Sequence, residues 1–203
     1  MIIVGDISIL IYTNKRMKFV VEADHHYYFE NNQRIDFQDF ISESQQNELL
    51  TRLQKHFDKK GRGLHGRNCW REDARVRGFV AGKSLAEVAG ALLNSKRLLL
   101  AYDQFFPQAP VDLFSAPTTL DAISSIQGIV GGWLITLAGD AKGTATLLTP
   151  NAEIDFSALQ YPLLLVVYAT PDAVYVAREG SLKSADYSPG DNLFRKGHPL
   201  ILS

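Results

Sequence analysis

Cysteine and net charge are both scarce in this sequence. Its 203 residues include one cysteine, Cys69, and the formal net charge at pH 7 is −1. A single cysteine forms no internal disulfide and supplies no cysteine-rich zinc site, a usage typical of a reducing compartment, so we expect a cytoplasmic protein. The near-neutral charge argues against a protein that binds nucleic acid through its overall electrostatic field.

Long apolar segments are lacking as well. The longest apolar runs, such as residues 163–169, are far shorter than the roughly 18 residues that cross a bilayer. Residues 1–12 are apolar, but Asp6 interrupts them, and they carry neither a basic region nor a small-residue cleavage site. We therefore expect a strand there, and neither a signal peptide nor a membrane span.

The composition is that of an ordinary globular protein, with 46% hydrophobic and 21% charged residues. A chain of this length can bury one sizeable core. No internal repeat, low-complexity segment or linker divides it. We expect a single domain, 1–203, in which residues 1–96 are mixed strands and helices and residues 97–203 form a β-rich core.

Helix signals lie in the first half of the chain. Ser42 followed by Gln45 is a capping-box pattern, and apolar residues then recur at helical spacing, which predicts a helix over about residues 43–59. Residues 70–81 are compatible with a second, short helix. A third helix is expected at Ser84, where the capping-box pattern is repeated.

Strand signals occur in both halves as short apolar runs bounded by Gly, Pro, Asn or Asp. In the first half they lie at residues 8–12, 17–21 and 25–29. In the second half they lie at residues 98–106, 126–138, 144–148, 161–169, 173–178 and 199–202. Short strands at this spacing, with a turn signal such as Pro171-Asp172 between them, are typical of a sandwich, a barrel or a jelly roll. The glycines within 128–132 lack the spacing of a phosphate-binding loop and predict a bulge or a close backbone approach.

Two sets of sequence segments resemble the phytanoyl-CoA dioxygenase-like group of iron(II)/2-oxoglutarate oxygenases. One is the segment 29–36 followed by Phe40-Ile-Ser-Glu and a helix. The other joins Cys69-Trp-Arg-Glu, the segment 85–93 and the segment 97–104, and is similar to the helices before that group's jelly roll and to its first core strand. The resemblance implies an α+β fold in which N-terminal strands and helices lead into a double-stranded β-helix of jelly-roll or cupin type.

The resemblance also implies a ligand set, because these oxygenases hold iron with a His-x-Asp/Glu pair and a distant histidine, leaving positions open for 2-oxoglutarate and oxygen. The histidines of this chain are His25, His26, His56, His65 and His198. None therefore lies between residues 66 and 197, and the one literal His-x-Asp, His56-Phe-Asp58, ends a predicted helix ahead of the jelly roll. The segment in which the resemblance implies the iron-binding histidines therefore contains no histidine.

The basic residue that usually follows the distant histidine, and holds the 2-oxoglutarate carboxylate, has no place here. Only five residues follow His198, and Arg178 and Arg195 precede it instead. The usual iron site therefore cannot be assembled from this chain. We assign no metal ligand and no catalytic residue.

Two other patterns of reactive residue types have ordinary alternatives. Glu22, Asp24 and His26 would share one face of a strand, where carboxylates and imidazole can bind a divalent metal; the alternative is an exposed polar edge. Cys69 would be a nucleophile only with a histidine base such as His65 nearby. The alternative is a small, partly buried side chain.

Basic residues concentrate between residues 55 and 83, a segment that has only three acidic residues. The nine basic residues are Lys55, Lys59, Lys60, Arg62, Arg67, Arg71, Arg75, Arg77 and Lys83. Guanidinium groups suit phosphate oxygens, so the segment is a candidate for binding a phosphate, a CoA-like anion, RNA or an acidic partner surface. The alternative is a solvated pair of helices. We expect Trp70 and Phe79 in the core rather than as platforms for stacked bases.

Polar residues also interrupt the strand predicted at 98–106. Alternation sends Asp103 to one face and Tyr102 and Gln104 to the other, where polar side chains inside a barrel need partners or a ligand. We therefore predict a pocket lined by Tyr102 and Gln104, with a satisfied polar network as the alternative. The candidate binding residues are Tyr102, Gln104, Arg67, Arg71 and Arg178.

Together these features predict a non-catalytic, oxygenase-derived jelly-roll domain that binds an unknown small ligand or protein partner. One alternative is an active oxygenase with an atypical metal site, for which iron(II) and 2-oxoglutarate would be the cofactors. The other is an interaction module that uses the basic segment 55–83.

Overall fold

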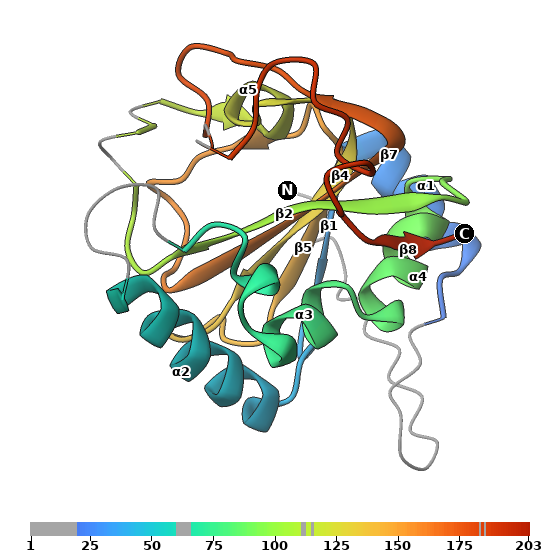
Figure 1. The fold of residues 1–203 in the computed structure, drawn as a ribbon. Helices are drawn as coiled ribbons and strands as arrows, with labels where there is room; N and C mark the ends of the chain where they lie inside the picture. The colour runs from blue at the N-terminus through green and yellow to red at the C-terminus, as the bar shows by residue number, and fades with distance from the viewer. Residues whose placement is uncertain (1–19, 60–65, 111–112, 115, 183, 185) are drawn as a thin grey trace.

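The centre of the molecule is a curled, six-stranded antiparallel sheet (Figure 1). The structure is a computed structural model that describes residues 20–59, 66–110, 113–114, 116–182, 184 and 186–203. The strand order is β1-β5-β4-β7-β2-β8. Their bounds are β1 Arg34–Phe37, β2 Leu98–Phe106, β4 Ile126–Thr136, β5 Ala145–Leu148, β7 Leu163–Tyr175 and β8 Leu200–Leu202.

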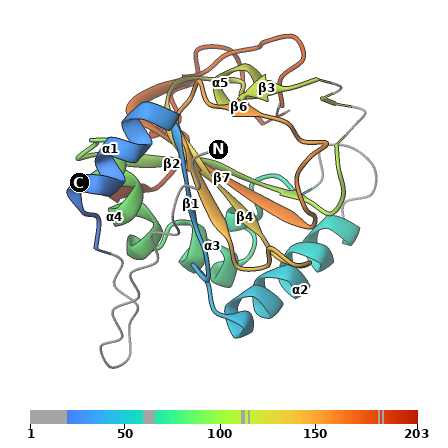
Figure 2. The same cartoon turned by 180° about the vertical axis from the view of Figure 1, so that it is seen from behind.

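Two layers cover the sheet. One face packs against helices α2 (Glu43–Lys59), α3 (Ala74–Val80) and α4 (Lys83–Leu92), with the short 3-10 helix η1 (Cys69–Arg71) beside them. The other face carries a two-stranded sheet of β3 (Thr118–Thr119) and β6 (Glu153–Ile154), together with helix α5 (Leu120–Ile123). Figure 2 shows β3, β6 and α5 grouped on the side of the sheet opposite α2, α3 and α4. Helix α1 (Ala23–Asn32) lies against β1.

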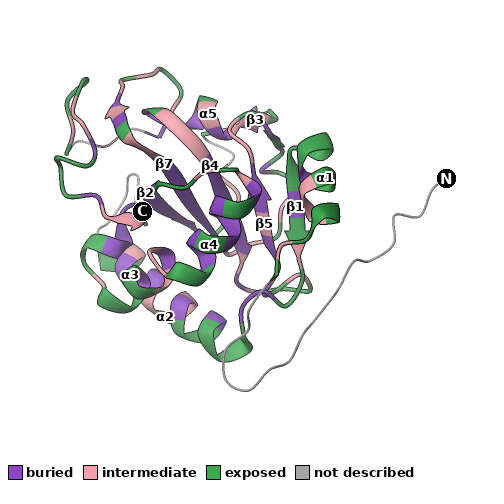
Figure 3. Ribbon diagram, turned by 90° about the vertical axis from the view of Figure 1, so that its right-hand side faces the viewer, coloured by how far each residue is buried: buried purple, intermediate pink, exposed green. Residues whose placement is uncertain are grey.

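Each face of the sheet has its own apolar core. Trp133 and Tyr168 pack toward the helices, whereas Leu99 and Val167 pack toward α5 and the two-stranded sheet. All nine residues of β2 are buried, as Figure 3 shows for the central strands. Burial on both faces explains why the strands were recognisable as nearly continuous apolar runs.

The helix predicted at residues 43–59 is confirmed as α2 with those bounds. The backbone N–H of Ser42 donates to Oε1 of Gln45 at 3.2 Å, and the N–H of Gln45 donates to Oγ of Ser42 at 3.3 Å. The capping box predicted at Ser84 is wrong, because helix α4 begins one residue earlier, at Lys83, and its N-cap is Gly82 in an extended conformation.

The strand predicted at residues 25–29 is also wrong, since these residues belong to α1. Glu22 and His25 form a capping box, in which the N–H of Glu22 donates to Nδ1 of His25 at 3.0 Å. This local pairing starts a helix where aromatic residues had suggested a strand. Residues 8–12, and 17–19 of the expected strand 17–21, lie outside the described residues.

The expected strands 161–169 and 173–178 are one strand, β7, so the predicted turn at Pro171-Asp172 is wrong. The ladder with β4 pairs Ala169 and then Val174, and skips the residues between them. Gly128, which has a φ of 95°, is the one β4 residue opposite this stretch, and β4 carries an extra residue of its own, Val130, between Ile129 and Gly131. The predicted irregularity at the glycines of β4 is thereby confirmed.

No helix within the described residues is long and apolar enough to cross a membrane.

Candidate ligand-binding site

Arg67 lies on the face of the sheet that packs toward α5, because residues 66–68 form backbone hydrogen bonds with β2. The N–H of Phe105 donates to the carbonyl oxygen of Gly66 at 2.8 Å, and the N–H of Asn68 donates to that of Asp103 at 2.9 Å. Arg67 therefore lies directly opposite Gln104 in an antiparallel bridge. Residues opposite one another in such a bridge project to the same face. The pairing places Arg67 on the face of Gln104, which packs toward α5.

Gly66 makes this approach possible. Its φ is 80°, and a Cβ atom there would lie 2.8 Å from the carbonyl oxygen of Phe105. Any other residue would be strained by the positive φ and would also collide with β2. Gly66 thus fixes where the next side chain, Arg67, enters the fold.

The guanidinium of Arg67 is buried and lies over an aromatic ring. Arg67 is 9% exposed, and its guanidinium carbon lies 3.9 Å from the centroid of the Tyr102 ring. Its Nε and Nη1 atoms are buried and have no hydrogen-bond partner in the part of the chain that the structure describes. Burial lowers the pKa of Arg67, but a guanidinium starts so far above neutrality that it stays charged.

Tyr102 is held by a short hydrogen-bond chain. Its hydroxyl lies 2.6 Å from Oγ of Ser124, whose own hydroxyl donates to the carbonyl oxygen of Leu120 at 2.7 Å. Because the Ser124 hydroxyl proton is used in the hydrogen bond to Leu120, the Tyr102 hydroxyl is the donor to Oγ of Ser124. Burial raises the pKa of Tyr102, so its ring is neutral at physiological pH.

Asp103 lies on the opposite face of β2, as the alternation predicted. Its two carboxylate oxygens accept hydrogen bonds from the backbone N–H groups of Cys69 and Trp70, at 3.0 and 3.1 Å. Burial raises the pKa of Asp103 to about 6. Its carboxylate holds helix η1 in place and does not pair with Arg67.

His198 has a defined tautomer. Its Nδ1 lies 2.9 Å from the carbonyl oxygen of Leu100, which can only accept, so Nδ1 carries the proton. Its Nε2 therefore accepts from the hydroxyl of Tyr187, 2.9 Å away, and that hydroxyl in turn accepts from Nη2 of Arg71 at 2.9 Å. Burial lowers the pKa of His198 to about 4. The imidazole is neutral, and both of its nitrogens have partners.

The predicted basic segment is tied to the fold at several points. Arg71 lies over the ring of Trp70, with its guanidinium carbon 4.3 Å from the ring centroid. Nε of Arg77 donates to the carbonyl oxygen of Trp70 at 2.9 Å. These guanidinium groups stabilise η1 and the start of α3. Trp70 is buried, as expected from the sequence, and Lys60 and Arg62 lie outside the described residues.

Arg178 binds elsewhere than the other candidates. Its Nη1 donates to Oδ2 of Asp121 at 2.8 Å and to the carbonyl oxygen of the same residue at 2.9 Å. The structure therefore brings together Arg67, Tyr102 and Gln104, and places Arg178 in an ion pair on α5.

The sequence-derived metal and nucleophile candidates are dispersed. Glu22, Asp24 and His26 lie at the start of a helix, where residues two apart do not share a face. Cys69 is buried, and His65 lies outside the described residues.

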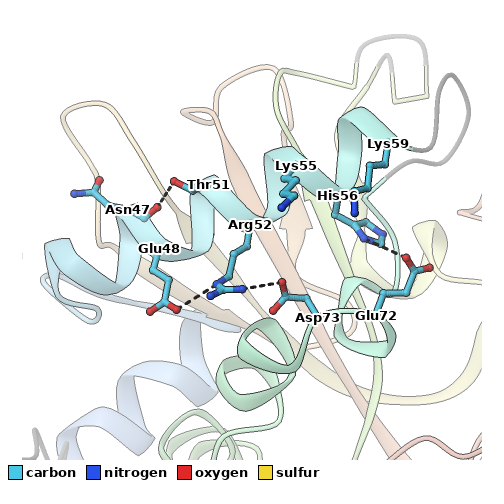
Figure 4. Close-up of a pocket in the computed structure, with 9 residues that line it drawn as sticks. All are labelled: Asn47, Glu48, Thr51, Arg52, Lys55, His56, Lys59, Glu72 and Asp73. Atoms are coloured by element: carbon cyan, nitrogen blue, oxygen red, sulfur yellow. Dashed lines mark hydrogen bonds and ion pairs between the residues drawn. The ribbon is translucent and has the colours of Figure 1, made fainter.

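His56, from the literal His-x-Asp, lines an open groove between α2 and the start of α3 (Figure 4). The groove has a volume of about 620 Å³. Nδ1 of His56 lies 3.5 Å from a carboxylate oxygen of Glu72, and Arg52 pairs with both Glu48 and Asp73 at 3.2 and 3.1 Å. The pairs formed by Arg52 and His56 therefore join α2 to the start of α3 and stabilise the helix packing.

Sequence reasoning missed three side chains near Arg67. Ser124, Tyr175 and Tyr187 lie 22, 73 and 85 residues after Tyr102 in the chain, on loops or at a strand end. Only the pairing of distant segments brings them to the site, and their spacing carries no local signal. Gly66 and Asn68, which flank Arg67, both have a positive φ, and the sequence shows only that both are residue types that tolerate it.

No protein-family model and no curated protein matches the sequence. Solved structures match its fold. The non-heme α-ketoglutarate-dependent carbocyclase SnoK from nogalamycin biosynthesis is 12% identical, with a TM-score of 0.70 over 89% of this chain and 96% of that chain. The epimerase SnoN, solved with Fe³⁺, α-ketoglutarate and nogalamycin RO, is 11% identical, with a TM-score of 0.62 over 87% and 96%. CT296 from Chlamydia trachomatis is 17% identical, with a TM-score of 0.56 over 76% and 99%.

At these identities the likeness concerns the fold. This chain has the mixed helical and curled antiparallel architecture of iron- and 2-oxoglutarate-dependent enzymes such as SnoK and SnoN. The described residues do not fit an iron of the usual kind, which needs two histidines and a carboxylate. They contain no cluster of three or more His, Cys, Asp or Glu side chains. Both nitrogens of His198, the one histidine of the β-rich half, are already engaged.

Proposed function

We propose that this chain is a non-catalytic domain, built on an oxygenase-like jelly roll, that binds a ligand or partner without turning it over. In this proposal the six-stranded sheet and the β3–β6 sheet are the two halves of a reduced double-stranded β-helix. The observation that carries the proposal is the packing between them. The space is filled by buried apolar side chains: Leu99, Ala101, Leu120, Ile123, Leu134, Leu148, Ile154, Leu165 and Val167.

This packing matters because an oxygenase needs room between its sheets for a metal, a cosubstrate and a substrate. Here Leu134 of β4, and Leu165 and Val167 of β7, occupy that space, and their side chains have no atom that can bind a metal ion. Polar groups gather around Arg67 and Tyr102 instead. A binding site beside a packed apolar core supports recognition better than it supports oxidation.

His198 supports the same conclusion. A metal at Nε2 would displace the Tyr187 hydroxyl, and a metal at Nδ1 would displace the Leu100 carbonyl. Either change would leave a polar group without its partner in a place where such loss is costly. An active oxygenase with an atypical site would have to avoid this residue.

The interaction-module alternative depends on fewer free charges than the sequence count suggested. Arg67 is buried, and Arg71 and Arg77 are hydrogen-bonded to Tyr187 and to the η1 backbone. Salt-insensitive binding would count further against a surface of this kind.

Turnover of 2-oxoglutarate tests the proposal. The purified chain is incubated with iron(II), ascorbate, 2-oxoglutarate and oxygen, and succinate is measured against a protein-free control. We expect no succinate above the control. Oxygen-dependent succinate formation over many turnovers would refute the proposal, and its survival in a variant with every histidine replaced by alanine would point to an iron site without histidine.

A further inference from the structure

We propose that Arg67 is the anchor of an anion site, which receives a single carboxylate or phosphate group of a small ligand on the face of β2 that packs toward α5. This inference rests on the proposed function, because it names the chemistry of the ligand that the domain binds. Arg67 differs from four other arginines of the molecule. Arg52, Arg71, Arg77 and Arg178 are each hydrogen-bonded through the guanidinium.

Among the residues that the structure describes, Arg67 is a buried cation without a counterion. Within the described residues, no carboxylate forms an ion pair with it, and its Nε and Nη1 atoms have no partner. The nearby Asp103 carboxylate lies on the other face of β2 with both oxygens bound to the backbone of η1. An unpaired charge in such a place is strongly unfavourable, and proteins normally supply a partner. A bound anion would be that partner.

The neighbouring phenols do not neutralise Arg67. Tyr102 donates to Ser124, and Tyr187 donates to His198. The hydroxyl of Tyr175 donates to the carbonyl oxygen of Ser184 at 3.3 Å. Each hydroxyl therefore keeps its proton in a hydrogen bond, and none of the three carries a negative charge beside the guanidinium.

The geometry selects an oxyanion of small size. The Tyr102 ring covers one face of the guanidinium, so a ligand approaches in its plane, where the N–H groups form a fork that matches carboxylate and phosphate oxygens. Because Arg67 is only 9% exposed, the proposed site takes one such group rather than a chain of them. Acetate and inorganic phosphate are therefore suitable probes, and comparing them separates the two anion types.

Thermal unfolding of the full chain at constant ionic strength tests the site, with chloride as the reference anion. We expect acetate, phosphate or both to raise Tm by about 4 °C at ten times the dissociation constant. Arg67→Met should have a higher Tm than the wild type in chloride, because it removes the unpaired charge. It should lose the response to acetate and phosphate, with affinity at least about tenfold weaker. Arg195→Met, at an exposed arginine, is the matched control and should respond as the wild type does.

A second measurement does not depend on the folding of a variant. In a ¹⁵N–¹H spectrum of the wild-type arginine side chains, the Nε–H signal of Arg67 should shift saturably with the active anion. An unshifted signal with both anions, or an equal Tm response in Arg67→Met, would overturn the anion site. These outcomes are separate from succinate formation, so iron-dependent turnover would refute the proposed function without deciding the anion site.

Discussion

The guanidinium carbon of Arg67 lies 3.9 Å from the centroid of the Tyr102 ring, inside the protein. A desolvated cation–π contact of this kind contributes about 2 kcal/mol. This contact adds to the links that already join the segment of Arg67 to strand β2, namely the backbone hydrogen bonds and the Asp103 carboxylate. It also sets the direction from which a ligand reaches the guanidinium.

We predict a coupling energy of about 1–2 kcal/mol between Arg67→Met and Tyr102→Leu in a double-mutant cycle of urea unfolding. Tyr102→Phe is the control, because it keeps the ring and loses only the hydrogen bond to Ser124. In a cycle with Arg67→Met, the phenylalanine variant should show little coupling. Additive effects in the leucine cycle would contradict a stabilising stack.

His198 should make stability depend on pH. Its pKa of about 4 in the folded protein lies below the unfolded value of about 6.5, so the unfolded chain binds more protons between these values. The stabilisation is fully present above about pH 6.5 and is lost as the pH falls toward 4. Relative to His198→Asn, the wild type should lose up to about 3 kcal/mol between pH 7 and pH 4.

The asparagine variant suits this test because its side-chain amide can donate to the Leu100 carbonyl without titrating. Asp103 has a raised pKa and acts in the opposite direction, losing stability as the pH rises toward 6. Its effect is common to both proteins and cancels in the comparison. A difference in unfolding free energy that stays constant from pH 7 to pH 4 would argue against a neutral, buried His198.

Gly66 should tolerate no side chain. Gly66→Ala places a Cβ atom 2.8 Å from the Phe105 carbonyl at a positive φ, so we expect a loss of about 2–4 kcal/mol in unfolding free energy. Gly78→Ala is the matched control, because nothing lies within 4 Å of its Cβ position in helix α3. That variant should gain about 0.5–1 kcal/mol from helix propensity. Equal effects of the two substitutions in urea unfolding would show that the close approach to β2 is not needed.

The predictable parts of this fold are the parts with local causes. Helix α2 follows from a capping box that spans four residues and from an apolar spacing within one segment, and its bounds are the expected ones. The opposite faces of Tyr102 and Asp103 follow from strand alternation alone. Helix α1 was missed because its start depends on His25 as a capping partner, in a segment whose aromatic residues favoured a strand.

The buried contact between Arg67 and Tyr102 could not be predicted from the sequence, because it depends on the pairing of segments that are distant in the chain. Counting charges identified a basic segment, but burial of Arg67 depends on the pairing of its backbone with Gln104, which lies 37 residues further along the chain. Arg178 seemed equivalent in the sequence and instead pairs with Asp121. Tertiary pairing thus decided which guanidinium became a buried cation and which became a surface ion pair.

The most direct test of the account is an anaerobic calorimetric titration of the purified, metal-free chain with iron(II) in the presence of 2-oxoglutarate. We predict no stoichiometric binding of iron, because His198 is fully hydrogen-bonded and the space between the sheets is filled by apolar side chains. Binding of 2-oxoglutarate alone, lost in Arg67→Met, would agree with the anion site. Saturable uptake of one iron per chain, strengthened by 2-oxoglutarate, would contradict the account.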